Sequence, residues 1–144
     1  METAATSFEV QLTIAHVQNA AEIEPAINAF AGKADSAIIV LPDNMLQQNQ
    51  EQIHALAAKH RLPDIYGNGL YLQIGGLLRY SSDWPDLYRR AASYVDRVLK
   101  GAKPGELPIQ QPIKFQLGIN LKTAKTLGIT IPPMLLARAD EVIE

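Results

Sequence analysis

The run from Ser36 to Asn44, with the sequence Ser-Ala-Ile-Ile-Val-Leu-Pro-Asp-Asn, limits what this chain can fold into more than any other segment. Its apolar, β-branched residues are continuous rather than alternating. Such a run is typical of a strand covered by helices on both faces, as in the middle of a parallel sheet. Ligands of such sheets lie beyond the carboxyl ends of the strands. We therefore expect Asp43 and Asn44 to lie where a ligand would bind.

The N-terminal part of the chain predicts one strand and one helix. Strict alternation over residues 8–14 predicts a half-buried strand near the edge of a sheet, with its apolar face formed by Phe8, Val10, Leu12 and Ile14. Asn19 followed by Glu22 is an N-cap pattern. Pro25 nevertheless favours a helix that begins only there and runs to Gly32.

The rest of the chain predicts helices and strands in alternation. Helices are expected over residues 44–60, 85–100, 121–127 and 132–143, and strands over 62–66, 77–80 and 115–119. The proline-rich residues 102–112 are expected to run extended over the surface. This order predicts an α/β fold with a mainly parallel sheet flanked by helices. The chain is long enough to form one such domain over residues 1–144.

Asp43 and Asn44 also have a purely structural interpretation. Either side chain is a natural N-cap for the helix that follows the strand. A cap at a strand end is common, and the structural and the ligand-binding roles do not exclude each other.

Two glycine-rich breaks bracket one short apolar segment. Gly67-Asn68-Gly69 precedes it and Gly75-Gly76 follows it. Glycine pairs permit a close approach of the backbone to a ligand, a crossing between lobes, or simply tight turns. The sequence leaves these alternatives open.

Composition excludes several classes of function. The net charge is −2 and the basic residues are dispersed, which argues against a nucleic acid or an anionic membrane as principal partner. The chain has no cysteine, so it has neither thiolate chemistry nor disulfides. His16, His54 and His60 are not at metal-ligand spacing, and we expect His54 on the surface, so no metal site is predicted.

The sequence contains no nucleophile elbow, phosphate loop or dinucleotide-binding glycine motif. Asp43 has no base or nucleophile to pair with, so an enzyme is the least favoured class and no cofactor is expected. No run reaches the length of a membrane span, and Met1 to Ala5 lacks the character of a signal peptide. The chain as written is therefore expected to be soluble, and cytoplasmic if it is complete.

The C-terminal third carries a recognisable pattern. Residues 97–133, and above all Asn-Leu-Lys-Thr-Ala-Lys-Thr-Leu-Gly over residues 120–128, resemble the signature of the ABC-transporter substrate-binding protein family. Relatives in that family include receptors for aromatic or branched amino acids. Looser matches lie upstream, at residues 42–44, 62–67 and 75–80. The resemblance covers nearly the whole chain but only about half of such a receptor.

The resemblance implies two α/β lobes of the type I periplasmic-binding-protein kind that close around a small solute. This chain resembles the second lobe, and residues 76–101 would cross to the first lobe or pack on a partner chain. By the same resemblance, the ligand-binding residues are Asp43, Asn44, Asn68, Gly75 and Gly76, with Asp43 suited to a ligand ammonium. An ABC permease is the implied partner, and the implied location is periplasmic. Arg79 and Ser81 depart from the family pattern, which bears on the identity of the solute.

A single lobe leaves the helix over residues 85–100 without its usual partner. Its apolar stripe consists of Leu87, Ala91, Val95, Val98 and Leu99. An exposed stripe of this kind favours self-association, so we expect a homodimer. The alternative function is a sensory or interaction scaffold that signals by dimerising.

Overall fold

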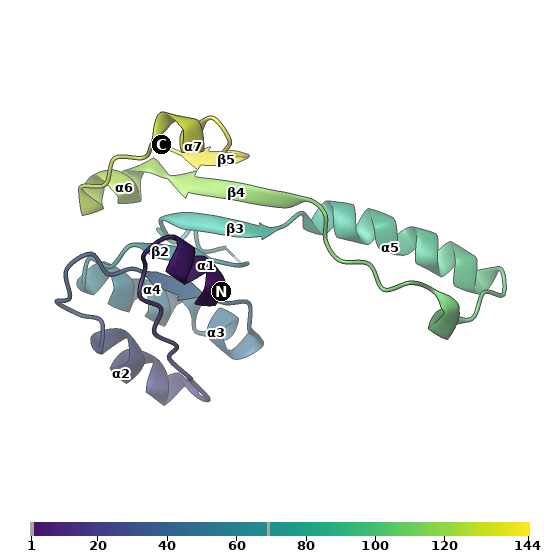
Figure 1. Cartoon of the computed structure of the whole chain (residues 1–144), viewed down its shortest axis with the longest axis horizontal. Coiled ribbons are helices and arrows are strands. Elements are labelled where there is room, and N and C mark those ends of the chain that lie inside the picture. Colours follow the sequence, from purple (N-terminus) through teal and green to yellow (C-terminus); the bar gives the residue numbers. More distant parts are fainter. Residues whose placement is uncertain (1, 69) are drawn as a thin grey trace.

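The computed structural model describes residues 2–68 and 70–144. In that part of the chain the strands are β1 Ile38–Val40, β2 Asp64–Tyr66, β3 Leu78–Ser82, β4 Phe115–Asn120 and β5 Glu141–Ile143. The α-helices are α1 Glu2–Ser7, α2 Ile23–Asn28, α3 Asn44–Gln48, α4 Gln50–Lys59, α5 Trp84–Leu99, α6 Leu121–Leu127 and α7 Pro133–Leu136. Figure 1 shows a body built around the sheet and a long arm that leaves it.

The strands form one sheet in the order β1-β2-β3-β4-β5. β1 pairs with β2, β2 with β3, and β4 with β5 in parallel, whereas β3 and β4 are antiparallel. Most of the sheet is therefore parallel, and the predicted α/β fold with a mainly parallel sheet is confirmed.

The hydrophobic core lies between β1 and β2 and the helices α2 and α4. Its buried side chains are Ile23, Ile27, Ile53, Leu56, Leu62, Tyr66 and Tyr71. The rings of Tyr66 and Tyr71 are stacked, with centroids 3.6 Å apart. Each fully buried Leu or Ile contributes about 1.5–3 kcal/mol. This layer therefore holds α2 and α4 against one face of the sheet.

A buried carboxylate joins β2 to β3. Asp64 is 4% exposed. Its Oδ1 accepts a hydrogen bond from the Leu77 backbone N–H at 2.6 Å, and its Oδ2 accepts one from the Tyr66 hydroxyl at 2.7 Å. Removing a buried acceptor leaves its donors unsatisfied, which is costly. Asp64 therefore fixes the beginnings of two neighbouring strands.

The arm comprises residues 84–114, that is, α5 and the segment that returns from it to β4. It starts where β3 ends and finishes where β4 begins (Figure 1). Asp83 caps α5 by accepting from the Asp86 N–H at 3.0 Å. Asp86 is the buried residue of α5, so the helix contributes little to the core of the body.

The predicted strand over residues 8–14 is wrong. Residues 2–7 form α1, and Val10 N–H bonds to the Ala5 carbonyl at 2.9 Å. Glu9 has a left-handed φ of 55°, which turns the chain out of the helix. Residues 10–18 follow without a place in the sheet, and Phe8 is 77% exposed. Alternation supplies one suitable face, but a strand also needs a neighbouring backbone edge to pair with.

The predicted helix over residues 132–143 is wrong beyond its first turn. α7 ends at Leu136, and the chain returns as β5 beside β4. Asp140 directs this return, because its N–H donates to the Leu117 carbonyl and its Oδ2 accepts from the Leu117 N–H, both at 2.8 Å. The open edge of β4 therefore outweighs the weak tendency of a short isolated segment to be helical.

The strand within residues 36–44 exists, but not between two helix layers as predicted. β1 lies at the end of the sheet, and β2 is its partner among the described strands. Successive side chains of a strand point to opposite faces. Ile38 and Val40 accordingly pack against the core, whereas Ile39 is 55% exposed.

Two helix boundaries also differ from the prediction. The helix expected over residues 44–60 breaks at Asn49, whose side chain donates to the Met45 carbonyl at 2.8 Å. α2 begins at Ile23 rather than at Pro25 and ends before Gly32. The Asn19 cap is confirmed, although it serves a 3-10 turn over Ala20–Glu22 that precedes α2.

The remaining expected helices and strands are confirmed with small shifts at their ends. The segment over residues 102–112, expected to be extended throughout, contains a 3-10 turn at Pro104–Glu106. α6 occupies the expected residues, with Asn120 as N-cap and Gly128 at a left-handed φ of 75°. Among the described residues, no helix combines the length and the hydropathy needed to cross a membrane.

The two stacked tyrosines predict how stability depends on pH. Burial raises the pKa of Tyr71 from 10.0 to about 12. Burial, together with the neighbouring Asp64 carboxylate, also raises the pKa of Tyr66. The unfolded chain loses these protons near pH 10 while the folded chain keeps them, so their contribution to stability is complete below pH 10 and declines above it. We expect the free energy of unfolding in urea to fall by about 1.4 kcal/mol per pH unit for each tyrosine above that pH.

Replacing Tyr71 by phenylalanine removes one of the two titrations. The slope above pH 10 should become shallower by about half in Tyr71→Phe, whereas Tyr88→Phe, at an exposed ring, should keep it. Equal slopes in wild type and Tyr71→Phe would contradict this account.

Candidate functional site

Parallel strands bring their carboxyl ends together, and here β1, β2 and β3 share one such edge of the sheet, the carboxyl edge. Asp43 and Asn44 directly follow β1, and Asn68 follows β2. The Asn68 amide donates to Oε1 of Gln47 at 3.4 Å, so the loop after β2 contacts α3. The structure thus places three of the five residues predicted to bind ligand at one edge of the sheet.

Asp43 has both a structural role and an unused oxygen. Its Oδ1 accepts from the Leu46 N–H at 3.0 Å and caps α3. Within the described residues, Oδ2 takes no hydrogen bond. A capping carboxylate favours the helix N-terminus, and its second oxygen can still accept from a ligand.

The loops after β1 and β2 are held close by a glycine. Gly67 N–H donates to the Val40 carbonyl at 3.1 Å. A Cβ on Gly67 would lie 2.7 Å from Cδ of Pro42. Only glycine therefore permits this close approach of the loop after β2 to the loop after β1.

Gly75 and Gly76 lie at the opposite end of the sheet. They precede β3, so they belong to the amino edge of the parallel strands. Gly75 has a φ of +112°, and a Cβ there would lie 2.6 Å from Nε2 of His54. A Cβ on Gly76 would lie 2.8 Å from the Tyr66 ring and from the Tyr71 carbonyl oxygen. The topology therefore separates these two glycines from the other predicted ligand residues.

A pocket of about 280 Å³ lies at the amino edge beside Gly75. Its polar lining is formed by His54, Arg61, Asp64, Thr123 and Thr126. Two of these groups bond within the protein, since Thr123 donates to the Gly75 carbonyl at 2.7 Å and Arg61 donates to the Thr126 carbonyl at 3.1 Å. The buried Nδ1 of His54 has no hydrogen-bond partner among the described residues. The pocket thus lies where the turn after α4 and the loop before β3 both bond to α6.

The expectation that His54 lies on the surface is wrong. Its side chain is 20% exposed, and its Nδ1 lies 3.6 Å from Oδ2 of Asp64. His54 lies on α4. The buried residues Ile53 and Leu56 of that helix indicated an apolar stripe that does not include His54. The reason is the missing side chain of Gly75, which leaves room for the imidazole against the sheet.

An aromatic pair that the sequence did not single out extends the carboxyl edge. Tyr80 of β3 and Phe115 of β4 stack with centroids 5.4 Å apart. Both rings are about half exposed, at 52% and 46%. Antiparallel pairing of strands distant in sequence creates this contact, so no local pattern predicts it.

Arg79, one of the departures from the family pattern, has a structural partner. Its guanidinium pairs with Oε2 of Glu141 at 2.8 Å and so ties β3 to β5 across β4. Among the described residues, no group of three His, Asp or Glu side chains is placed to hold a metal ion.

The chain matches the model of the family described as ABC transporter substrate binding protein over residues 1–143. Two solved structures share its fold closely. A conserved domain protein from Vibrio cholerae has 30% identity and a TM-score of 0.86, and covers 98% of this chain and 47% of its own. An ABC domain from Streptococcus pneumoniae in complex with L-Trp has 28% identity and a TM-score of 0.87. The match covers 98% of this chain and 48% of that domain's own chain.

A ligand-free, open substrate-binding protein with adhesive properties from Clostridium difficile is a more distant neighbour. At 17% identity and a TM-score of 0.68, covering 99% of this chain and 47% of its own, it shows likeness of fold alone. None of the curated protein sequences matches the chain. The chain therefore spans about half the length of each of these solved structures.

The packing at Gly76 generates a prediction. Gly76→Ala places a methyl group against the Tyr66 ring and the Tyr71 carbonyl, and we expect it to destabilise the fold by about 1–3 kcal/mol in urea unfolding. Gly105→Ala is the matched control, because its added Cβ meets no atom within 4 Å. Equal stability of the two variants would show that the described packing at Gly76 is not close.

Proposed function

Because the chain belongs to the ABC transporter substrate-binding protein family, we propose that it forms one wall of the solute-binding cleft of an ABC importer. The wall is the carboxyl edge of the sheet. The observation that carries this proposal is the contact of Asn68, which follows β2, with Gln47 of α3, the helix that Asp43 caps after β1. In open α/β sheets this edge is the usual place for a ligand.

The solute we propose is an amino acid or a comparable small molecule. Oδ2 of Asp43 can accept from an ammonium group in a charge-assisted hydrogen bond. Asn44 and Asn68 supply amides that both donate and accept. The similarity to the Streptococcus pneumoniae domain in complex with L-Trp supports including aromatic amino acids. The half-exposed rings of Tyr80 and Phe115 offer such a side chain a flat apolar surface at the same edge.

Gly75 and Gly76 have an indirect part in this proposal. Gly76 allows close packing of the chain before β3 against Tyr66 and Tyr71, and Gly75 leaves room for His54. The Tyr71 hydroxyl donates to the Leu46 carbonyl of α3 at 3.2 Å. The glycines therefore support the helix that Asp43 caps, from the far end of the sheet.

A cleft buries a solute between two walls, and most of the ligand surface is usually covered. The chain spans about half the length of these solved relatives. We therefore expect the chain by itself to bind its solute weakly, because one side of the solute stays in water.

The proposal includes partners and a location. An ABC permease would receive the solute, which leaves the site chemically unchanged. The proposed location is the periplasm, as is usual for importer receptors in the family. We also propose that a second copy of the chain is a partner.

A second candidate function is a scaffold that signals by dimerising. The observation that favours it is the exposed apolar side chains of α5, such as Leu99 at 82%. A scaffold needs no solute. The two functions are therefore distinguished by whether an added amino acid shifts the amide resonances of residues at the carboxyl edge.

The test is a titration of the chain with amino acids, including L-Trp, at millimolar concentration, followed by amide shifts in ¹H–¹⁵N spectra. Shifts should concentrate at residues 43–47 and 68. Asp43→Asn keeps a good N-cap but removes the charge, so binding should weaken roughly 10- to 100-fold, the value of a hydrogen bond to a charged group.

Asp35→Asn is the matched control, since it removes an exposed acid away from the carboxyl edge at a left-handed φ of 54° that asparagine tolerates. It should bind like the wild type. Solute binding that is unchanged in Asp43→Asn, or shifts confined to the amino edge, would refute the proposed site.

A further inference from the structure

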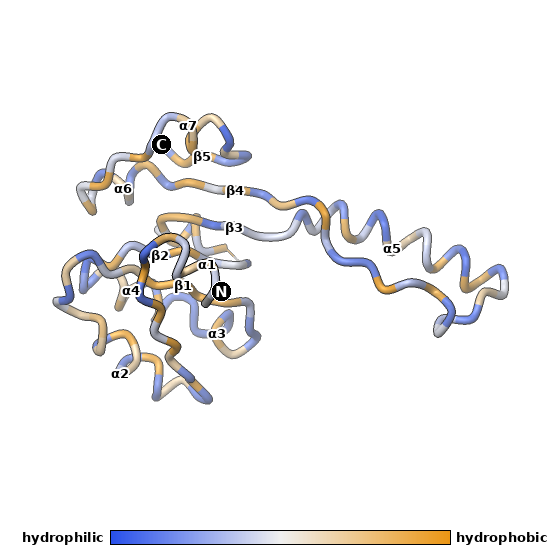
Figure 2. Tube along the Cα trace, in the orientation of Figure 1, coloured by the Kyte–Doolittle hydropathy of each residue, from blue (hydrophilic) through white to orange (hydrophobic). Residues whose placement is uncertain are grey.

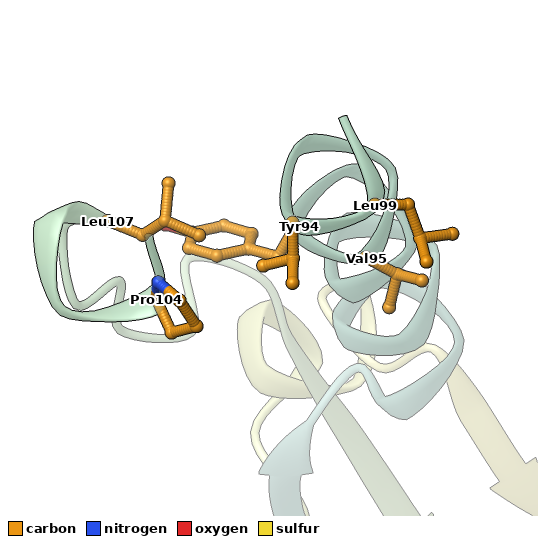
Figure 3. A pocket seen from close by; sticks show the side chains of 6 residues that line it. Tyr94, Val95, Leu99, Pro104 and Leu107 are labelled. Carbon is orange, nitrogen blue, oxygen red and sulfur yellow. The ribbon is translucent and has the colours of Figure 1, made fainter. Parts of the chain in front are cut away.

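Two pockets of the structure differ in the chemistry of their linings. One, of about 330 Å³, lies on the arm, where hydrophobic (orange) positions recur along α5 in Figure 2. Figure 3 shows Tyr94 pointing toward Leu107 of the returning segment. The Tyr94 hydroxyl donates to the Pro108 carbonyl at 2.6 Å, and the other lining side chains are apolar. The pocket at the amino edge contains ionisable side chains instead.

The amino-edge pocket lies at the opposite end of the strands from the arm. It is lined by residues of α4, of α6 and of the loop before β3. The arm leaves the sheet after Ser82, at the carboxyl end of β3, whereas Gly75 of the pocket precedes β3. Contacts made by the arm therefore lie at the other end of the sheet.

The buried charge in this pocket is that of Asp64, whose side chain is 3% exposed. Its two oxygens accept from the Leu77 backbone N–H and from the Tyr66 hydroxyl, at 2.6 and 2.7 Å. Acceptance through both oxygens matches the ionised form of a carboxyl group. Both donors are neutral. A carboxylate buried among neutral donors favours a positive charge close to it.

His54 places a ring nitrogen beside this carboxylate. Its Nδ1 is buried, lies 3.6 Å from Oδ2 of Asp64 and has no hydrogen-bond partner among the described residues. The distance is too long for a hydrogen bond, and a buried polar atom without a partner is costly. The other ring nitrogen, Nε2, packs against Gly75, where a Cβ would lie 2.6 Å from it. One proton between Nδ1 and Oδ2 would satisfy both atoms.

The other charged groups near His54 are exposed to water. Arg61 lines the same pocket, and its guanidinium donates to the Thr126 carbonyl at 3.1 Å. On α4 itself, Glu51 precedes His54 by one turn. The lining residues of α6 are neutral. Water screens exposed charges more than buried ones, so Asp64 acts most strongly on the imidazole.

We propose that His54 and Asp64 form a proton-dependent latch between α4 and β2. The imidazole takes up one proton from the solvent, and Nδ1–H then donates to Oδ2 of Asp64. A movement of under about 1 Å brings the two atoms to the distance of a charge-assisted hydrogen bond. Histidine ordinarily changes its charge between about pH 5 and pH 8, so the latch closes as the pH falls through this range.

The latch acts on the residue that fixes the beginnings of β2 and β3. Oδ2 of Asp64 already accepts from Tyr66, and the imidazolium adds a second, charged donor to it. The folded chain gains this bond and the unfolded chain does not, so folding favours uptake of the proton. The contribution of the latch to stability is therefore present at low pH and lost as the pH rises.

The first experiment measures the equilibrium constant for unfolding in urea at about pH 6 and about pH 8 in the wild type and in His54→Gln. Glutamine is polar and favours a helix, but it takes up no proton. On lowering the pH, the constant should fall about threefold to tenfold more in the wild type than in His54→Gln.

His16→Gln is the matched control. His16 is exposed and lies outside the pocket, so this variant should keep the pH dependence of the wild type. An equal pH dependence in the wild type and His54→Gln would overturn the proposal.

A second measurement uses the unsubstituted chain and so does not depend on the folding of a variant. Long-range ¹H–¹⁵N spectra of the histidine rings show which nitrogens carry protons. At about pH 6, His54 should carry a proton on both nitrogens, and the buried Nδ1 proton should exchange slowly with water.

A His54 ring that is neutral at that pH contradicts the latch. Neither measurement contains a solute. Failure of the amino-acid titration at the carboxyl edge therefore leaves the latch standing, and failure of the latch leaves the proposed function standing.

Discussion

The buried carboxylate of Asp64 is the interaction on which the arrangement of the body depends. It accepts from the Leu77 backbone and from the Tyr66 hydroxyl, and so fixes both the spacing of two strands and the orientation of one ring. That ring stacks on Tyr71, whose hydroxyl reaches the Leu46 carbonyl in the first turn of α3. The N–H of Leu46 in turn binds the capping carboxylate. A continuous series of contacts thus connects the amino edge of the sheet to the candidate site at the carboxyl edge, and two of its members are buried polar groups that cannot lose a partner cheaply.

Much of the fold was predictable from local signals. α6 is bounded by Asn120 and Gly128, residues whose side chain or backbone conformation acts within a few positions along the chain. β1, β2, β3 and β4 were recognisable from composition and breaks. The failures have a shared physical cause. Residues 8–14 alternate but have no partner in the described sheet, and residues 141–143 form a strand because β4 offers an edge. Strand pairing depends on two segments, so the residue pattern of one segment alone cannot predict it.

The residues of the candidate site also fall into those that the sequence predicts and those that depend on tertiary contacts. Asp43, Asn44 and Asn68 could be placed together from sequence, because parallel strands carry their ends to one edge. Gly75 and Gly76 could not be placed, since their role depends on side chains that approach from elsewhere in the chain. The Tyr80–Phe115 stack and the Asn68 contact with Gln47 likewise arise from tertiary structure. Polar residues at strand ends can therefore be predicted from sequence, whereas the side chains that pack around them from distant segments cannot.

The antiparallel pairing of β3 and β4 has a consequence for the modularity of the chain. The two ends of the arm leave the sheet at adjacent, hydrogen-bonded positions, since Ser82 is paired with Phe115 and Asp83 with Lys114. Topologically, the arm is an insertion into a β-hairpin, and the sheet would keep every ladder bond if a tight turn closed that hairpin directly. The arm can therefore fray or diverge in sequence as a separate unit without cost to the strand order. The exposed surface of the arm is thereby uncoupled from the sheet that holds the candidate site.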